Sequence, residues 1–284
     1  EQTNSSSLLP RPKRKLFIMK RLRILSLGAG VQSSTLALMI EKGEVPMVDA
    51  AIFSDTMSEP KAVYDWLKWL KTKLSYPVYI VKKGDLKKDT IQTLADYHQF
   101  SLIPVYTKNK ITGKAGLSRR QCTNHYKIIP VNKKVRELLG LQKGERVKKD
   151  VHVEMLMGIS KDETFRMKIN PKKYITNIYP LVERDFRRIH CVEWMEKNNY
   201  PKPPRSACTF CPFHNNEEWK LVKENKQEWD EVVELDNFIR NKSRNKDEEL
   251  FLHNSKKPID EIDFDEKTDQ LDLFTNECEG MCGV

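Results

Sequence analysis

Apolar residues along the chain form short runs that alternate with longer stretches of helical spacing. The run at Leu22–Leu25 is typical of a buried strand, and residues 33–40 then place their apolar side chains on one helical face. Residues 101–118 show no periodicity, and we expect a mobile loop near a site there. Further strands are predicted at 48–55, 77–81, 151–159 and 178–182, and further helices at 60–74, 85–100, 124–139 and 216–241.

One more helix is expected after Asp185, which would cap it. Its inner face would carry Phe186, Ile189, Val192 and Met195. Strands that alternate with helices indicate an α/β fold, with an open, mostly parallel twisted sheet and helices on both faces. We expect a C-terminal helical extension and a flexible tail to follow this sheet.

The stretch after the first strand has the composition of a phosphate-binding turn. Gly28, Ala29 and Gly30 lead directly into Ser33 and Ser34 at the start of the predicted helix. A helix N-terminus presents backbone N–H groups and a positive dipole end, which together favour an anion. An ordinary strand-to-helix turn would have the same composition, so the pattern alone leaves both interpretations open.

Two other segments are expected at the same place. In a parallel sheet, ligands lie beyond the carboxyl ends of the strands. Asp55 and Thr56 end the second predicted strand, and Gly158–Ser160 ends the fourth. We therefore expect both segments to meet the glycine turn in one crevice.

Charge is distributed unevenly along the chain, whose net charge is +10. Twelve acidic residues and three lysines give residues 247–284 a charge of −9, which leaves +19 on the rest. A basic body attracts nucleotides, sulfate esters or nucleic acid, although a solvated lysine-rich surface would have the same composition. No apolar run reaches the roughly 20 residues of a membrane span, and we expect a cytoplasmic protein.

These patterns suggest four parts. Residues 1–18 are expected to lie outside the fold as a disordered leader or added sequence. Residues 19–214 would form the nucleotide-binding α/β domain. The helical extension would span 215–246, and the acidic, cysteine-bearing tail would span 247–284.

The cysteines suggest a thiolate site rather than disulfides. The six are Cys122, Cys191, Cys208, Cys211, Cys278 and Cys282. Cys208 and Cys211 form a CxxC pair, and Cys122 lies in a basic segment that would favour a thiolate. These three could hold an iron–sulfur cluster, or zinc together with His214 or His190. Cys191 is interpreted as a packing residue within a helix.

These motifs, in this order, resemble the phosphoadenosine phosphosulfate (PAPS) reductase family. That family belongs to the PP-loop superfamily of adenine-nucleotide α-hydrolases, with its HUP-type α/β fold. The resemblance covers about residues 22–213, and the terminal Cys282-Gly283 resembles the mobile catalytic thiol motif of the reductases. The residues that carry it are the glycine turn, Asp55-Thr56, Cys122 with Lys127–Pro130, Gly158 with Asp162-Glu163 and Arg166, Tyr179–Leu181, and the CxxC pair.

The resemblance implies a role for each matching position. Residues 28–33 would stand for the SGGxDS phosphate loop, with Gln32 in place of its aspartate, which weakens the case for magnesium-assisted splitting of ATP. Asp55 would lie near the ribose or adenine, and Arg166 would hold an anionic group. The implied nucleotide-binding residues are Ser26, Gly28, Ala29, Gly30, Gln32, Ser33, Ser34, Asp55, Thr56, Gly158 and Arg166.

The resemblance also implies a [4Fe-4S] cluster, with zinc as the alternative. Its ligands would be Cys122, Cys208 and Cys211, with Cys191 as a possible fourth. Cys282 or Cys278 would be the catalytic thiol, because the Gly-rich end that carries them can swing into a cleft. A disordered tail whose cysteines have no role would look the same.

Three functions remain open at this point. In the first, a C-terminal thiol attacks the sulfur of a sulfonucleotide such as PAPS or adenosine phosphosulfate (APS), and a thioredoxin-like protein supplies reductant. In the second, ATP, with or without Mg²⁺, activates a nucleic acid for sulfur transfer. In the third, the chain is a nucleotide-binding accessory protein without turnover. We favour the first, in a protein that forms homo-oligomers.

Overall fold

A five-stranded parallel sheet forms the centre of the computed structural model, which describes residues 20–95 and 101–265. The strand order is β3-β2-β1-β6-β7, and each neighbouring pair is parallel. The strands are β1 (Lys20–Leu27), β2 (Ala50–Asp55), β3 (Val78–Lys82), β6 (Val151–Met157) and β7 (Ile175–Ile178). This arrangement confirms the predicted α/β fold class.

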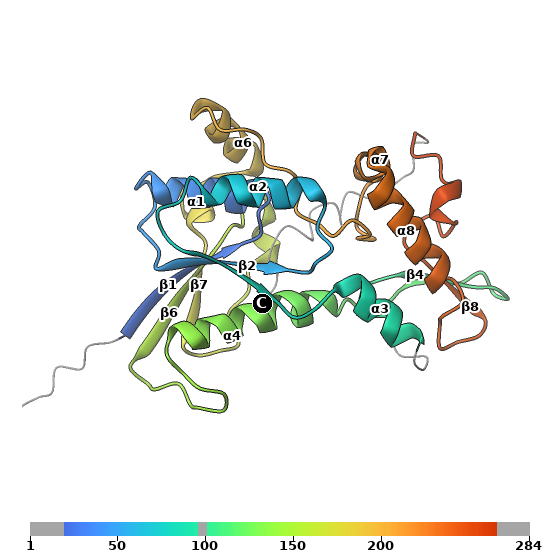
Figure 1. The fold of residues 1–284 in the computed structure, drawn as a ribbon, viewed down its shortest axis with the longest axis horizontal. Coiled ribbons are helices and arrows are strands. Elements are labelled where there is room, and N and C mark those ends of the chain that lie inside the picture. The colour runs from blue at the N-terminus through green and yellow to red at the C-terminus, as the bar shows by residue number, and fades with distance from the viewer. Residues whose placement is uncertain (1–19, 96–100, 266–284) are drawn as a thin grey trace, which may run out of the picture.

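Helices cover both faces of this sheet. The helices α1 (Val31–Glu41), α2 (Lys61–Lys71) and α6 (Arg188–Lys197) lie on one face, and α4 (Ile129–Leu138) lies on the other (Figure 1). Because α1 packs against the sheet and its neighbouring helices, every residue from Val31 to Ile40 is buried. The carboxyl end of β1 leads directly into this helix, so the glycine turn is held between two buried elements.

The helix predicted over 124–139 is present and begins irregularly. A π-helix, η1 (Thr123–Ile128), runs directly into α4. Pro130 has no N–H to offer the carbonyl of Tyr126 four residues earlier. The Ser54 hydroxyl donates to that carbonyl instead, at 2.6 Å, so the irregular turn is tied to the end of β2.

The prediction of a loop without secondary structure at 101–118 is wrong. This segment contains β4 (Tyr106–Asn109) and β5 (Ala115–Leu117), which pair as an antiparallel hairpin. The Asn109 side chain accepts two N–H groups within the turn. Strands this short carry too few residues for an apolar alternation to be visible in the sequence.

The hairpin pairs with a strand far along the chain. β8 (Glu248–Phe251) lies antiparallel to β4, although it falls within the segment that we assigned to the acidic tail. Leu250 of β8 is buried together with Leu252 and Ile259 in a second hydrophobic core, separate from the cores that flank the parallel sheet. Residues 247–265 are thus part of the folded structure.

Three helices complete this second core. They are α3 (Leu86–Ala95), α7 (Asn216–Glu224) and α8 (Lys226–Ile239). The prediction of a single helix over 216–241 is wrong, because the chain leaves helical geometry at Asn225, with φ −94° and ψ 100°. Asn225 then caps α8 by accepting the N–H of Glu228.

The segment after β7 also differs from expectation. A strand was predicted at 178–182, but α5 (Pro180–Glu183) begins there with proline in its first turn. Asp185 has φ +61° and lies before α6, whose N-cap is Arg187. Ile189 is 55% exposed and does not belong to the predicted inner face. The rest of that face is confirmed, because Met195 is buried and Phe186 and Val192 pack against the core. The buried residues of α6 are Cys191, Trp194 and Met195.

In the described part of the chain, no helix is both long enough and apolar enough to cross a membrane. Two short 3₁₀ helices complete the described structure: η2 (Lys161–Arg166) and η3 (Ile259–Glu261).

Candidate functional site

The glycine turn joins β1 to α1 in a tight, self-bonded loop. Ala29 adopts φ +61°, a left-handed conformation that non-glycine residues seldom take. The Gly28 N–H donates to the Ser33 hydroxyl at 3.2 Å, and that hydroxyl lies 3.4 Å from the Gly30 carbonyl. The turn is therefore shaped by Ser33, from within the first helical turn.

The N-terminus of α1 has the features that favour an anion. Gly30 is the N-cap and has no side chain to bond the N–H groups of the first turn, and that turn contains no acidic residue. Gly158, at the end of β6, lies so close that a Cβ atom there would be 2.6 Å from Ser33 Cα. The structure thus brings the predicted residues of the turn together with Gly158.

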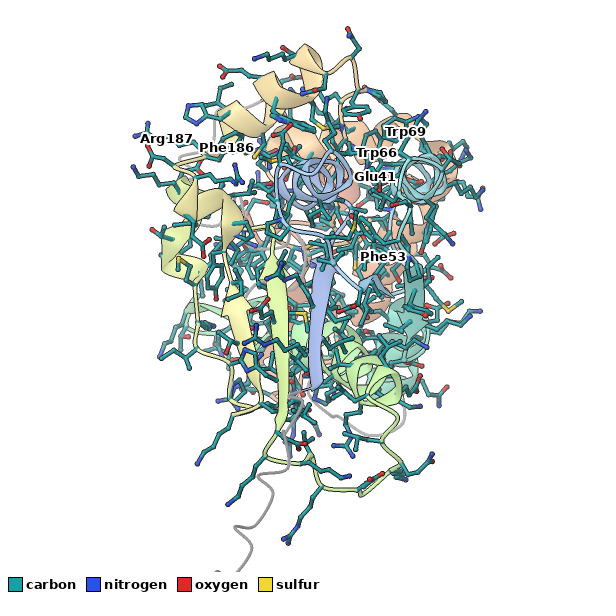
Figure 2. The ribbon with its side chains drawn as sticks, turned by 90° about the vertical axis from the view of Figure 1, so that its left-hand side faces the viewer. Glu41, Phe53, Trp66, Trp69, Phe186 and Arg187 are labelled. Atoms are coloured by element: carbon teal, nitrogen blue, oxygen red, sulfur yellow. The ribbon has the colours of Figure 1, made fainter. Side chains whose placement is uncertain are left out.

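Two predicted nucleotide-binding serines lie on the core side. Ser26 is buried within β1. The Ser34 hydroxyl accepts the indole N–H of Trp66 at 2.9 Å, and Trp66 and Trp69 of α2 lie beside α1 (Figure 2). Both serines are therefore part of the buried packing around the turn.

A polar network surrounds Gln32. Its amide oxygen accepts a hydrogen bond from the Arg188 guanidinium at 2.9 Å, and its amide nitrogen is 3.5 Å from the Ser160 hydroxyl. Ser160 donates to Asp162 at 2.5 Å. Sequence reasoning missed Arg188: the adjacent arginines 187 and 188 were visible, but nothing showed which one faces the turn.

Arg166 is paired within its own short helix. Its guanidinium donates to Glu163 at 2.6 Å, and both side chains are at most 5% exposed. Glu163 thus offsets the positive charge of the Arg166 guanidinium, which we expected to hold an anionic group of the nucleotide. The role of Arg166 in nucleotide binding stays a prediction.

Asp55 and Thr56 lie at the carboxyl end of β2, next to β1. Asp55 accepts the Met57 N–H at 2.7 Å and the Tyr64 hydroxyl at 2.8 Å. Burial and then the Asp55 carboxylate raise the pKa of Tyr64 far above its usual value, so Tyr64 acts as a donor here. Thr56 is fully buried, and its hydroxyl lies 3.2 Å from Cys208 Sγ.

Three of the cysteines line one small cavity. Cys122 comes from the start of η1, and Cys208 and Cys211 come from the loop before α7. The loop is held by a hydrogen bond from the Thr209 N–H to the Ser58 carbonyl at 2.9 Å, which ties it to the segment after β2. The three predicted thiols therefore converge although they are distant in sequence.

A buried ion pair lies beside this cavity. Lys127, which also lines it, is 3.7 Å from Glu59, and both side chains are at most 9% exposed. Glu59 in turn lies within 3.4 Å of the Thr56 hydroxyl. A series of contacts thus runs from Lys127 to Glu59, from Glu59 to Thr56, and from Thr56 to Cys208. The sequence showed Lys127 only as part of a motif and gave no signal for Glu59.

The cavity as it stands does not fit a metal ion or a cluster. It measures about 20 Å³, room for about one water molecule. Among the residues that the structure describes, no three histidine, cysteine or acidic side chains are arranged to hold a metal ion. The donors are of the type that zinc and iron–sulfur clusters use, but the thiols would have to move to bind either.

The other proposed ligands are placed differently. Cys191 packs in the core between α6 and α1, where its carbonyl is 3.4 Å from the Thr35 hydroxyl, so the structure does not bring it to the thiol cavity. His190 accepts the Arg187 N–H through its ring. His214 is adjacent to the CxxC loop, but its Nε2 contacts the Cys208 carbonyl at 2.9 Å. Cys278 and Cys282 lie outside the described residues.

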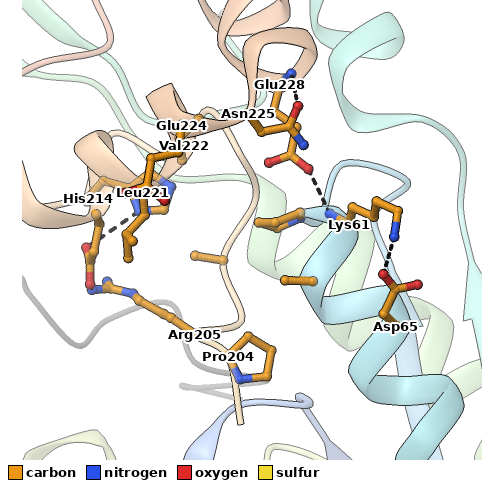
Figure 3. A pocket seen from close by; sticks show the side chains of 14 residues that line it. Lys61, Asp65, Pro204, Arg205, His214, Leu221, Val222, Glu224, Asn225 and Glu228 are labelled. Atoms are coloured by element: carbon orange, nitrogen blue, oxygen red, sulfur yellow. Dashed lines mark hydrogen bonds and ion pairs between the residues drawn. The ribbon is translucent and has the colours of Figure 1, made fainter. Parts of the chain in front are cut away.

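A larger hollow of about 560 Å³ opens between α2 and the helices α7 and α8 (Figure 3). Its walls include Leu221 and Val222, and Glu228 bridges it by accepting the N–H of Lys61 at 2.8 Å. His214 forms part of its lining, and burial, assisted by Arg205, lowers the pKa of His214 to about 3. The glycine turn and the three thiols do not line this hollow.

Comparisons with known proteins give a limited result. No protein-family model matches the chain, and no curated protein matches it. A solved structure with similar architecture is the phosphoadenylyl-sulfate (PAPS) reductase from Candida auris in its phosphate complex. The identity is 15%, the match covers 65% of this chain and 75% of that chain, and the TM-score is 0.41.

Proposed function

We propose that this chain is an enzyme of sulfur chemistry that binds an adenine nucleotide at the glycine turn and uses cysteine thiols. The observation that carries the proposal is the placement of two sites on adjacent strands. The glycine turn follows β1, and Thr56, which contacts Cys208, follows β2. A nucleotide whose phosphates are bound at α1 would therefore place its reactive end at the edge of the sheet where the thiols also lie.

The favoured reaction is reduction of a sulfonucleotide. A thiolate attacks the sulfur of the sulfuryl group, the bond from sulfur to the phosphate oxygen breaks, and the adenine nucleotide leaves with both electrons of that bond. A second thiolate then attacks the cysteine sulfur of the enzyme thiosulfonate. The bond from that sulfur to the sulfonate sulfur breaks, sulfite leaves with its electron pair, and a disulfide remains. An external dithiol restores the thiols.

We assign the first attack to Cys282 or Cys278, as the sequence suggested. The N–H groups of α1 would hold the phosphates. The chemistry needs no metal, and a metal or cluster at Cys122, Cys208 and Cys211 stays a prediction. Metal and sulfide analysis of anaerobically purified protein tests it.

The decisive experiment compares the full chain with a truncation after Phe274 and with Cys282→Ser and Cys278→Ser. We expect truncation to leave nucleotide affinity nearly unchanged and to abolish sulfite release under reducing, anaerobic conditions. Cys282→Ser should be the more damaging substitution. Normal turnover by the truncated chain would exclude a role for the tail.

Two further outcomes would redirect the assignment. Turnover with ATP and a sulfur donor, and none with PAPS or APS, would make the chain a sulfurtransferase. Nucleotide binding without turnover under either condition would make it an accessory protein.

A further inference from the structure

Two segments beside the second core are rich in cations and contain no acidic residue. The first, residues 101–120, includes the β4–β5 hairpin, and the second, residues 240–246, is the loop that joins α8 to β8. The exposed lysines of the two segments are Lys108, Lys110, Lys114 and Lys246. Each segment alone would also suit a solvated surface, so their arrangement in space decides what they form.

The fold brings the two segments together. The pairing of β4 with β8 continues into the turn, where the Lys110 N–H donates to the Asp247 carbonyl at 2.6 Å. The Lys110 ammonium donates to the Asn241 amide oxygen at 3.3 Å. In the described part of the chain, the other three exposed lysines have no carboxylate within ion-pair distance. Because like charges on one face repel one another, this surface favours an anionic partner.

A second hollow, of about 440 Å³, lies between these segments, and we call it the hairpin hollow. Its lining includes the apolar side chains of Leu94, Val105 and Leu250, and the cation Lys242. Ser101 also lines it and is 6% exposed, and its hydroxyl has no hydrogen-bond partner among the residues that the structure describes. A buried hydroxyl without a partner costs free energy, so a ligand that supplies one would be favoured here.

A single-stranded nucleic acid fits both features. Its phosphodiester backbone repeats negative charges, which the exposed lysines would bind with release of counterions. A cavity of this size, with apolar walls and a hydroxyl, suits an unstacked base. In a duplex the bases are paired and stacked, so placing one in the hollow would first cost the energy of extruding it.

We propose that the β4–β5 hairpin and the loop 240–246 form a binding surface for single-stranded nucleic acid, with phosphates on the lysines and one base in the hairpin hollow. The inference goes beyond the proposed reduction of a sulfonucleotide and does not depend on the glycine turn. The surface lies beside the thiols instead. Ser101 and Val105 line the hairpin hollow, whereas Ile103 and Pro104, between them in the chain, line the thiol cavity.

The test is fluorescence anisotropy of labelled single-stranded RNA and DNA of about 12 nucleotides, titrated with the full chain at several salt concentrations. The triple variant Lys108→Ala, Lys110→Ala and Lys114→Ala should weaken binding about tenfold or more. It should also reduce the slope of log affinity against log salt by about two, because each phosphate contact on a single strand contributes about 0.7.

The matched control is the triple variant Lys143→Ala, Lys148→Ala and Lys149→Ala, which loses the same charge. These exposed lysines lie in the loop between α4 and β6, at the end of the molecule away from β4 and β8 (Figure 1). The control should change affinity less than about twofold, since exposed charges at a distance are screened. Equal weakening by the two triple variants would overturn the inference, because binding would then follow total charge.

Ser101→Ala tests the hairpin hollow. It should weaken binding of the single strand about twofold to tenfold, as expected for a lost hydrogen bond between neutral groups. It should leave binding of inorganic polyphosphate unchanged, because polyphosphate carries charge without bases. Thermal unfolding of each variant verifies that the fold is retained. An equal effect of Ser101→Ala on both ligands, or none on either, would show that no base enters the hollow and would overturn the inference.

Gly30→Val separates this surface from the proposed nucleotide site. A valine side chain at the glycine turn would block a phosphate there and should leave affinity for the single strand unchanged. Loss of strand binding in Gly30→Val with the fold retained would move the nucleic acid to the glycine turn and overturn the inference. A full chain that binds ATP, PAPS or APS but no single strand would also overturn it, and the nucleotide site would stand.

Discussion

Gly158 lies closer to the glycine turn than any residue with a side chain could. A Cβ atom at this position would be 2.6 Å from Ser33 Cα and 2.7 Å from Ser33 N, both atoms of the first helical turn. Real Cβ atoms do not approach backbone so closely. The carboxyl end of β6 therefore packs directly against the proposed phosphate site.

We expect Gly158→Ala to displace the turn and weaken adenine-nucleotide binding about tenfold or more, with a stability loss of about 1–3 kcal/mol from overpacking. Calorimetry with ATP and urea denaturation measure the two effects. Gly140→Ala is the control, because Gly140 has φ +76° and nothing within 4 Å of its Cβ position. It should cost about 1 kcal/mol of stability and leave affinity unchanged.

At the same scale, the sequence showed the turn but not its surroundings. Gly28, Gly30 and Gly158 could be found because glycine and its position after a strand are local signals. Arg188 and Glu59 could not, because each reaches its place through tertiary packing. Nothing local to residue 188 indicates that Gln32, 156 positions earlier, will accept its hydrogen bond.

At the scale of elements, the strands and helices of the central sheet were predictable and their interruptions were not. The helical period runs unbroken through 216–241 because Trp219 and Val232 both face the same core. The break at Asn225 depends on a side chain that caps the next helix. Likewise, β8 pairs with β4 over a separation that no local pattern reveals.

The start of α7 gives a test at this scale. Asn215 accepts the Glu218 N–H at 2.9 Å, and Glu218 accepts the Asn215 N–H at 2.9 Å, which together form a capping box. Asn215→Ala should lower the free energy of unfolding by about 1 kcal/mol, measured in urea. Asn215→Ser keeps an acceptor and should retain most of the stability. No loss of stability in Asn215→Ala would show that the cap contributes nothing.

At the scale of the whole molecule, the second core joins distant parts of the chain. Asp236 of α8 is fully buried and accepts the N–H groups of Leu252 and Ile259, while its carboxylate pairs with Arg240. The CxxC loop and Cys122 belong to this same core. The thiol cavity is therefore built where the second core meets the carboxyl edge of the parallel sheet.

Two buried histidines make the stability of this core depend on pH. Burial, assisted by nearby cations, lowers the pKa of His214 to about 3 and that of His253 to about 4, from 6.5. Both are thus neutral in the folded chain, whereas the unfolded chain takes up protons below about pH 6.5. Between pH 6.5 and 4 the unfolded state binds more protons, so acidification favours unfolding.

We therefore expect the free energy of unfolding to fall as the pH is lowered from about 7 to about 5, by about 2 kcal/mol for each histidine. Urea denaturation at a series of pH values measures it. His253→Gln can replace the ring in its contacts with Ser255 and Asn216 without titrating, so it should remove about half of the pH dependence. A flat profile in the unchanged chain, or an unchanged slope in His253→Gln, would show that these histidines do not govern the acid sensitivity of the fold.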